Sequence, residues 1–208
     1  MGGFAVSDEP EKQPVRETTE DELRASTIGE LQPINSKVLI AAYDSDWPRQ
    51  FAAEASKIRT ALGERALVLE HVGSTSVPEL RAKPILDILL VVADSSDEAA
   101  YVPALEQAGY VLRIREPAWF EHRVLKGVAP DVNLHVFSPD CEETERMLLM
   151  RDWLRTHDAD RDLYARTKQE LAQRDWKYVQ HYADAKTEVV EGILARARAA
   201  GASSPGHS

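Results

Sequence analysis

Cysteine is almost absent from this chain of 208 residues, because Cys141 is the only one. An internal disulfide bond is therefore impossible, and zinc sites built from several cysteines are excluded. The sequence also has no apolar run near the roughly 18 residues of a membrane-spanning helix. Its N-terminus lacks the basic and apolar segments of a secretory signal. We therefore expect a cytoplasmic protein with no membrane partner.

Basic residues are fewer than acidic ones, 25 against 35, which gives a net charge of −10. Proteins that bind nucleic acid along its backbone need clustered lysines and arginines. We therefore expect no extended nucleic-acid surface, although a small basic pocket is compatible with this composition. The hydrophobic share of 43% is ordinary for a globular protein, and the length suits one good core.

Charge and apolar content set the two ends of the chain apart. Residues 1–35 contain eight acidic and three basic residues, with few large apolar side chains and no sustained period. That composition predicts a disordered acidic tail, and residues 201–208, GASSPGHS, predict a flexible C-terminus. The folded domain is expected over residues 36–200. A chain that begins at Ser36 should therefore keep its melting temperature.

The spacing of apolar residues alternates between the period of strands and the period of helices. From Asp46 to Leu62 they recur every three or four positions, with Asp46 suited to the N-cap and Gly63 to the C-terminal stop. Further helices are expected at 97–108, 142–156, 160–174 and 180–199, and strands at 37–42, 66–72, 84–92, 110–115, 119–126 and 132–137. This order predicts an α+β or mixed α/β domain, with the C-terminal helices packed on the sheet.

Residues 71–92, HVGSTSVPELRAKPILDILLVV, form the most informative segment. Gly73 and Ser74 make a turn directly after a β-like run, and one carboxylate, Asp87, interrupts the next apolar run. Glycine allows a close approach of the backbone, and loop N–H groups with the hydroxyls of Ser74 and Thr75 can hold an anion. A charge in an apolar strand is costly unless it is paired, bound to a metal or placed at a site. The segment therefore predicts a phosphate-and-metal corner.

Several segments resemble the GrpB family, and they occur in the order found there. They are YDSDWPRQFAAEASKIRTAL, EHVGSTSVPELRAKPILDILLVV, VNLHVF, RDWLRTHDADRDLYARTKQELAQ and YADAKTEVVEGIL. The similarity covers about residues 38–197, and the GSTSVP and AKPILDI motifs are fairly specific. The family belongs to the nucleotidyltransferase superfamily of DNA polymerase beta. The resemblance implies a nucleotidyltransferase-like fold, in which helices flank a mixed sheet and further helices follow at the C-terminus.

In that superfamily a Gly-Ser turn binds the nucleotide phosphates, and strand carboxylates two positions apart hold Mg2+. The resemblance assigns Mg2+ to Asp87 here. The residues two positions from Asp87 are Ile85 and Leu89, so the paired carboxylate is missing. Asp87 could instead form a structural ion pair with Lys83 or Arg123. A metal site would need help from one of Glu70, Glu121, Asp131 and His135.

Three polar residues near these strands each have two readings. His135 is either a core histidine or, since it shares a face with Asn133 that could lie beside the strand carboxylate, a ligand or general base. We prefer the second reading. Lys83 either binds phosphate or caps the loop. Arg123 either binds an anion or faces solvent, and because His122 is its neighbour, only one of the two can face the site.

Two Tyr–Lys pairs, each four residues apart, lie in the predicted C-terminal helices: Tyr164 with Lys168 and Tyr182 with Lys186. Such a pair could receive a nucleotide's phosphates and base on one helix face. Alternatively, the tyrosines pack against the sheet while the lysines extend to water. We expect this alternative for Lys168, and both readings stay open for Lys186.

These residues lead to two functional hypotheses. The first is a nucleotidyltransferase-like enzyme that binds a nucleoside triphosphate with Mg2+ and transfers a nucleotidyl group to a small acceptor. The second is a non-catalytic module for a nucleotide or a coenzyme A-related compound, since GrpB proteins are sometimes fused to dephospho-coenzyme A kinase. The site residues would be Asp87 and His135 for catalysis, Asp87 for the metal, and Gly73, Ser74, Thr75, Lys83, Arg123 and Lys186 for the nucleotide.

Overall fold

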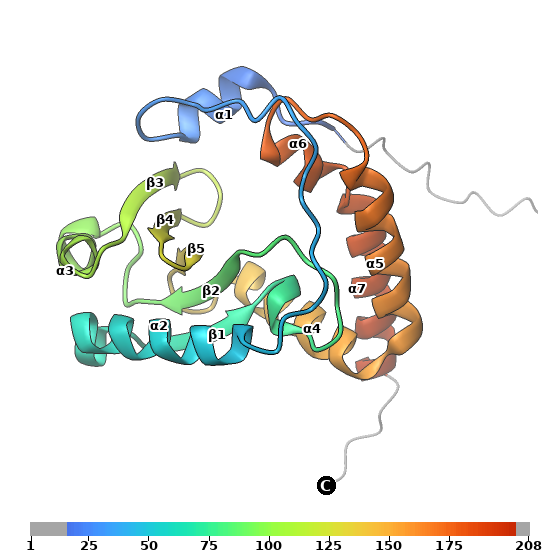
Figure 1. Cartoon of the computed structure of the whole chain (residues 1–208). Helices are drawn as coiled ribbons and strands as arrows, with labels where there is room; N and C mark the ends of the chain where they lie inside the picture. Colours follow the sequence, from blue (N-terminus) through green and yellow to red (C-terminus); the bar gives the residue numbers. More distant parts are fainter. Residues whose placement is uncertain (1–15, 203–208) are drawn as a thin grey trace, which may run out of the picture.

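A five-stranded sheet forms the centre of the computed structural model, which describes residues 16–202 (Figure 1). The strand order is β1-β2-β5-β4-β3. β2 and β5 are parallel, and the other neighbouring pairs are antiparallel. The sheet is therefore mixed, and the predicted α+β class is confirmed. The strands are β1 (Val68–Val72), β2 (Leu86–Val91), β3 (Val111–Glu116), β4 (His122–Val128) and β5 (Asp131–Phe137).

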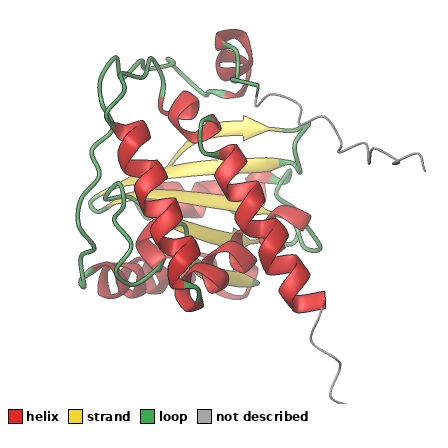
Figure 2. Cartoon of the chain, turned by 90° about the vertical axis from the view of Figure 1, so that its right-hand side faces the viewer, coloured by secondary structure: helices red, strands yellow, loops and turns green. Residues whose placement is uncertain are grey.

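Helices cover both faces of the sheet. α2 and α3 bury one face, where Ile58 and Leu105 pack with Leu134 in the main core. α4 packs on the other face, where Met147 and Leu148 meet a second apolar cluster, and α5 and α7 pack against α4. Figure 2, seen from the side on which Figure 1 labels α5 and α7, shows two long helices in front of the strands. The helices are α1 (Glu20–Ser26), α2 (Trp47–Leu62), α3 (Val102–Gln107), α4 (Glu142–Thr156), α5 (Asp158–Ala172), α6 (Val179–Asp184) and α7 (Thr187–Ala202).

Some predicted elements are shorter or interrupted. The expected strand at 37–42 makes only an isolated bridge, between Ala41 and Ala82. The expected helix at 180–199 breaks between α6 and α7, which leaves Lys186 at the junction. None of the described helices is both long and apolar enough to cross a membrane. Residues 203–208 of the predicted C-terminal tail lie outside the described residues.

The register of the sheet decides which polar side chains share a face. Asp87 on β2 pairs with Asn133 on β5, and His135 lies two residues further along β5. On β4 the partner of His135 is Val124, so His122 falls on the same face and its neighbour falls on the other. This polar face is the one on which α4 packs.

Residues 16–35 differ from the expected disordered tail. Within them α1 begins with a capping box and buries Leu23, and the backbone N–H of Ile28 then donates to the carbonyl of Arg113 on β3 at 2.8 Å. A hydrogen bond also joins this segment to α6, beside which α1 lies in Figure 1. A few apolar and hydrogen-bonding anchors therefore order a segment whose average composition predicts disorder. Because these anchors contact the domain, a chain that begins at Ser36 should lose stability, contrary to the expectation from the sequence. Residues 1–15 lie outside the described residues.

Leu23→Ala should lower the free energy of unfolding by about 2 kcal/mol, because it removes the buried side chain of α1. Chemical denaturation of the full chain measures this. The exposed Glu30→Ala in the same segment is the control and should change stability little. Equal stability of the two variants would mean that α1 does not pack on the domain.

Candidate functional site

The turn after β1 rests directly on the carboxylate of β2. Gly73 has a φ of +67°, and a Cβ placed there would lie 2.9 Å from the Cβ of Asp87 and closer still to its Oδ2. Both the left-handed conformation and the close approach therefore need glycine. Gly73 and Asp87, predicted to form one corner, are in contact.

The hydroxyls that follow Gly73 have different partners. Thr75 is buried, its hydroxyl lies 3.0 Å from His71 Nε2, and it donates to the carbonyl of Ile85 at 3.2 Å. Ser74 is only partly buried and accepts a hydrogen bond from Lys168. Of these two predicted phosphate ligands, only Ser74 lies where a ligand could reach it, because Thr75 holds the loop to β2.

Asp87 is held by donors from β5. Its side chain is 30% exposed, Asn133 Nδ2 donates to Oδ1 at 2.7 Å, and His135 Nε2 lies 3.5 Å from the same oxygen. Burial acts to raise the pKa of Asp87, but His135, Asn133 and Lys186 outweigh it and hold this pKa below its ordinary value. The expectation that His135 shares the site with Asp87 agrees with this geometry.

Arg123 does not reach this corner. Its side chain is buried on the opposite face of the sheet, where Nε lies 2.6 Å from Glu98 Oε1 and Nη2 lies 3.2 Å from Glu121 Oε2. The neighbour, His122, shares the polar face and places its Nε2 3.1 Å from His135 Nδ1. The prediction that only one of the two faces the site holds, but the choice of Arg123 was wrong. Cross-strand register, which the sequence leaves open, decides between them.

Lys168 is buried, contrary to the expectation that it extends to water. Its exposed fraction is 2%, and Nζ donates to Ser74 Oγ at 2.9 Å and to the carbonyl of Arg81 at 2.5 Å. Burial lowers the pKa of Lys168 to about 7, Lys186 adds to this, and Asp87 opposes it. No carboxylate of the described residues forms an ion pair with Lys168. It is a buried cation whose charge has no direct counterion.

Further lysines surround the same corner. Lys186 lies at the junction of α6 and α7 with Nζ 4.6 Å from the ring centre of Tyr182, and its charge acts on both Asp87 and Lys168. The pKa of Lys83 is lowered by burial and by Lys126, whereas two aspartates act to raise it. Three lysines thus interact electrostatically with Asp87, although the chain is acidic as a whole: Lys83, Lys168 and Lys186. Lys126, which acts on Lys83, is itself paired with Asp131.

Among residues 16–202, no second carboxylate lies beside Asp87. Each acidic candidate instead pairs with a basic side chain: Glu70 with Arg151 at 2.8 Å, Glu121 with Arg123 at 3.2 Å, and Asp131 with Lys126 at 3.1 Å. Within residues 16–202 there is no group of three His, Cys, Asp or Glu side chains placed to hold a metal ion. Of the four further metal ligands considered from the sequence, only His135 is in contact with Asp87.

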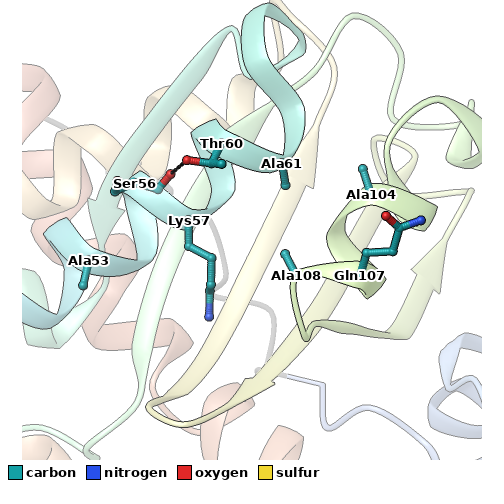
Figure 3. Close-up of a pocket in the computed structure, with 8 residues that line it drawn as sticks. All are labelled: Ala53, Ser56, Lys57, Thr60, Ala61, Ala104, Gln107 and Ala108. Atoms are coloured by element: carbon teal, nitrogen blue, oxygen red, sulfur yellow. Dashed lines mark hydrogen bonds between the residues drawn. The ribbon is translucent and has the colours of Figure 1, made fainter.

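A groove lies elsewhere on the described surface, between α2 and α3 (Figure 3). It has a volume of about 630 Å³ and contains none of the predicted site residues. Its lining is dominated by small side chains, with Lys57 the one charged group among them. The chemistry of the chain therefore gathers at the Gly-Ser turn, not in this groove.

Comparison with known proteins agrees with the resemblance seen in the sequence. The model of the GrpB protein family matches residues 37–196. The chain belongs to the GrpB family. UPF0157 protein BH1888 of Halalkalibacterium halodurans is 59% identical over 87% of this chain and 93% of its own length. The crystal structure of conserved protein GrpB from Enterococcus faecalis superposes with a TM-score of 0.66 at 30% identity, covering 76% of this chain and 96% of that chain.

A third relative has a name that states an activity. A dephospho-CoA kinase of Mycolicibacterium paratuberculosis is 26% identical, and the match covers 72% of this chain but 43% of that protein. The GrpB-like part is therefore less than half of that relative. The name describes the whole kinase and assigns no activity to the matching segment.

Gly73→Ala should lower the free energy of unfolding by about 2–4 kcal/mol, because the new methyl group meets Asp87 and the backbone is left-handed. Gly63→Ala is the matched control, since Gly63 has a φ of +59° with nothing within 4 Å of an added Cβ, and about 1 kcal/mol is expected. Denaturant unfolding compares the two.

A double variant isolates the contact. In an Asp87→Gly background the cost of Gly73→Ala should fall toward that of Gly63→Ala, because Asp87→Gly removes both the carboxylate and the Cβ that the new methyl group would meet, and only the backbone strain remains. The close approach would be wrong if Gly73→Ala cost the same in both backgrounds.

Proposed function

We propose that this GrpB domain binds a nucleotide through its phosphates at the corner formed by the Gly73–Ser74 turn and the surrounding lysines. The observation that carries the proposal is Lys168, a buried amine that has no carboxylate partner within residues 16–202. An unpaired buried charge is costly in an isolated protein and is expected where an anionic ligand completes the pair. An acidic chain that gathers Lys83, Lys168 and Lys186 around one carboxylate beside this turn is suited to a multiply charged anion.

The residues at this corner would contribute to phosphate binding in different ways. Gly73 is exposed, so a phosphate can approach the backbone of the turn on the side away from Asp87, whose carboxylate fills the space of the missing side chain. The ammonium group of Lys168 is already oriented by Ser74 and by the Arg81 carbonyl, so little side-chain freedom is lost on binding. Lys186 and Lys83 supply further charge from the helix junction and the loop.

A pair of Mg2+ ions, as the family resemblance implies, does not fit the residues present. Asp87 Oδ1 already accepts a hydrogen bond from Asn133, and Oδ2 lies against Gly73. The positions two residues away on the chain are the buried, apolar Ile85 and Leu89. Mg2+ prefers oxygen ligands in regular geometry, whereas this site offers a single carboxylate beside an imidazole. The proposal therefore assigns the neutralisation of phosphate charge to the lysines.

Nucleotidyl transfer is a second candidate function, and the contact between Asp87 and His135 favours it. A hydroxyl acceptor bound beside Asp87 would lose its proton to His135 Nε2 as its oxygen attacks the α-phosphorus of the nucleotide. The bond from that phosphorus to the bridging oxygen breaks, and pyrophosphate leaves with the electron pair. A coenzyme A-related compound also carries phosphates and would use the same lysines without this step.

Lys168→Met should weaken nucleotide binding by about 10- to 100-fold, because a charge-assisted hydrogen bond to phosphate contributes about 1.5–3 kcal/mol. Calorimetry with ATP, UTP, coenzyme A and tripolyphosphate, each in EDTA and again in Mg2+, measures the affinity. Lys177→Met is the control, because Lys177 is exposed and paired with Glu20, and it should bind as the wild type does.

The unliganded Lys168→Met protein should be at least as stable as the wild type, because an apolar side chain replaces an unpaired buried charge. A variant that binds normally would contradict the proposal. Binding only with Mg2+, abolished by Asp87→Asn, would show that the carboxylate holds a metal after all. Release of pyrophosphate from a triphosphate in the presence of an acceptor would favour transfer over binding alone.

The contribution of Lys168 to binding should depend on pH. Its pKa in the free protein is about 7, below the ordinary 10.5, so the side chain is charged at lower pH and neutral at higher pH. The affinity ratio of wild type to Lys168→Met should therefore fall as pH rises from about 6 to about 8.5. Taking the ratio removes the ionisation of the ligand itself. A ratio that does not change with pH would mean that the ammonium group keeps its charge throughout.

A further inference from the structure

Four side chains, one from each of four strands, form a continuous chain across the polar face of the sheet. Glu116 Oε2 on β3 lies 2.7 Å from His122 Nδ1 on β4. His122 Nε2 lies 3.1 Å from His135 Nδ1 on β5, and His135 Nε2 lies 3.5 Å from Asp87 Oδ1 on β2. Every ring nitrogen of both histidines thus faces the next member of the chain.

In this row of four side chains, the two histidines in the middle are largely buried and the two carboxylates at the ends are accessible to solvent. The side chains of His122 and His135 are 5% and 19% exposed, whereas those of Glu116 and Asp87 are 35% and 30% exposed. Trp119 packs its edge on His122 at 5.0 Å, and Phe137 stacks on it at 4.5 Å between ring centres. A buried link between two accessible carboxylates is the form expected of a path for protons.

The number of protons shared by these four side chains follows from the three contacts between them. Three contacts need three protons, but two neutral imidazoles supply two. One contact is then left with two facing acceptors. The longest contact is the one between His135 Nε2 and Asp87, at 3.5 Å, against 2.7 and 3.1 Å for the others. In the state with two protons, the vacancy is therefore assigned to the end next to the Gly-Ser turn. A third proton, on His135 Nε2, completes the contact through which His135 lowers the pKa of Asp87.

We propose that Glu116, His122 and His135 relay a proton from the site at Asp87 to the surface of the protein. A proton released at the site binds His135 Nε2, the proton on His135 Nδ1 passes to His122 Nε2, and the proton on His122 Nδ1 passes to Glu116 Oε2. One proton enters and one leaves, and both imidazoles end neutral in the opposite tautomer. Glu116, whose side chain is partly exposed, then returns the proton to water.

Other charges near the pair leave this direction in place. Glu143 on α4 acts on His135, but it is itself paired with Arg146 at 2.9 Å. Burial lowers the pKa of His122, the hydrogen bond to Glu116 opposes this, and Arg123 on the other face lowers it further. A lasting positive charge on His122 is therefore disfavoured, so it passes a proton on.

The relay rests on the proposed function only for the origin of its proton, so the chain can be tested without a ligand. In the full-length protein labelled with 15N-histidine, NMR follows the ring nitrogens of His122 and His135 from about pH 8 to about pH 5. Single His→Gln variants assign the signals. The pair should take up one proton in a shared step, with both rings changing at the same midpoint, because the three contacts hold only three protons.

Glu116→Gln removes the charge at the outer end and should lower this midpoint by about 1 pH unit for both histidines. Glu121→Gln is the matched control, because Glu121 lies in the adjacent turn and pairs with Arg123 on the other face, and it should leave the midpoint unchanged. Independent titration of the two rings, or a shift of His122 alone in Glu116→Gln, would overturn the relay. Loss of nucleotide binding would overturn the proposed function and leave the histidine result intact.

Discussion

The contact between the Gly73 backbone and the Asp87 carboxylate is the constraint on which the rest of the site depends. Because no side chain separates them, the turn after β1 lies directly on the first part of β2. That position brings Ser74 within reach of Lys168 on α5, 94 residues further along the chain. It also leaves the carboxylate open on its other side to the amide of Asn133, which donates to it, and to the imidazole of His135. The sheet, the turn and a C-terminal helix therefore meet at one point.

Much of this corner could be predicted from the sequence, because glycine and a lone strand carboxylate are strong local signals. The pairing of Asp87 with His135 follows from the two-residue period of strands once the two strands are neighbours. The choice between His122 and Arg123 could not be made, because it depends on the register between β4 and β5, which pairs Val124 with His135 and which no local pattern reveals. The burial of Lys168 depends on how α5 docks, which no local pattern encodes.

The distribution of charge suggests how the domain tolerates a cationic corner. Lys168 and Lys186 each lie 4.6 Å from the ring centre of a tyrosine four residues earlier in the sequence. An aromatic face attracts a cation without neutralising it, so these contacts steady the lysines while their charge remains available. A carboxylate in the same place would stabilise the free protein more but would compete with an anionic ligand. The arrangement therefore lowers the stability of the free protein but favours the binding of an anion.

Residues 27 and 28, which precede α2, affect whether the sheet can pair with a strand of another chain. β3 is the last strand of the sheet, and its outer side would present free backbone groups to any strand of another chain. Residues 27 and 28 occupy part of that side, through the bridge from Thr27 to Ile114 and the hydrogen bond from Ile28 to Arg113. These two residues therefore cover part of the exposed edge of β3. This covering hinders edge-to-edge pairing of β3 with the same strand of another copy of the domain.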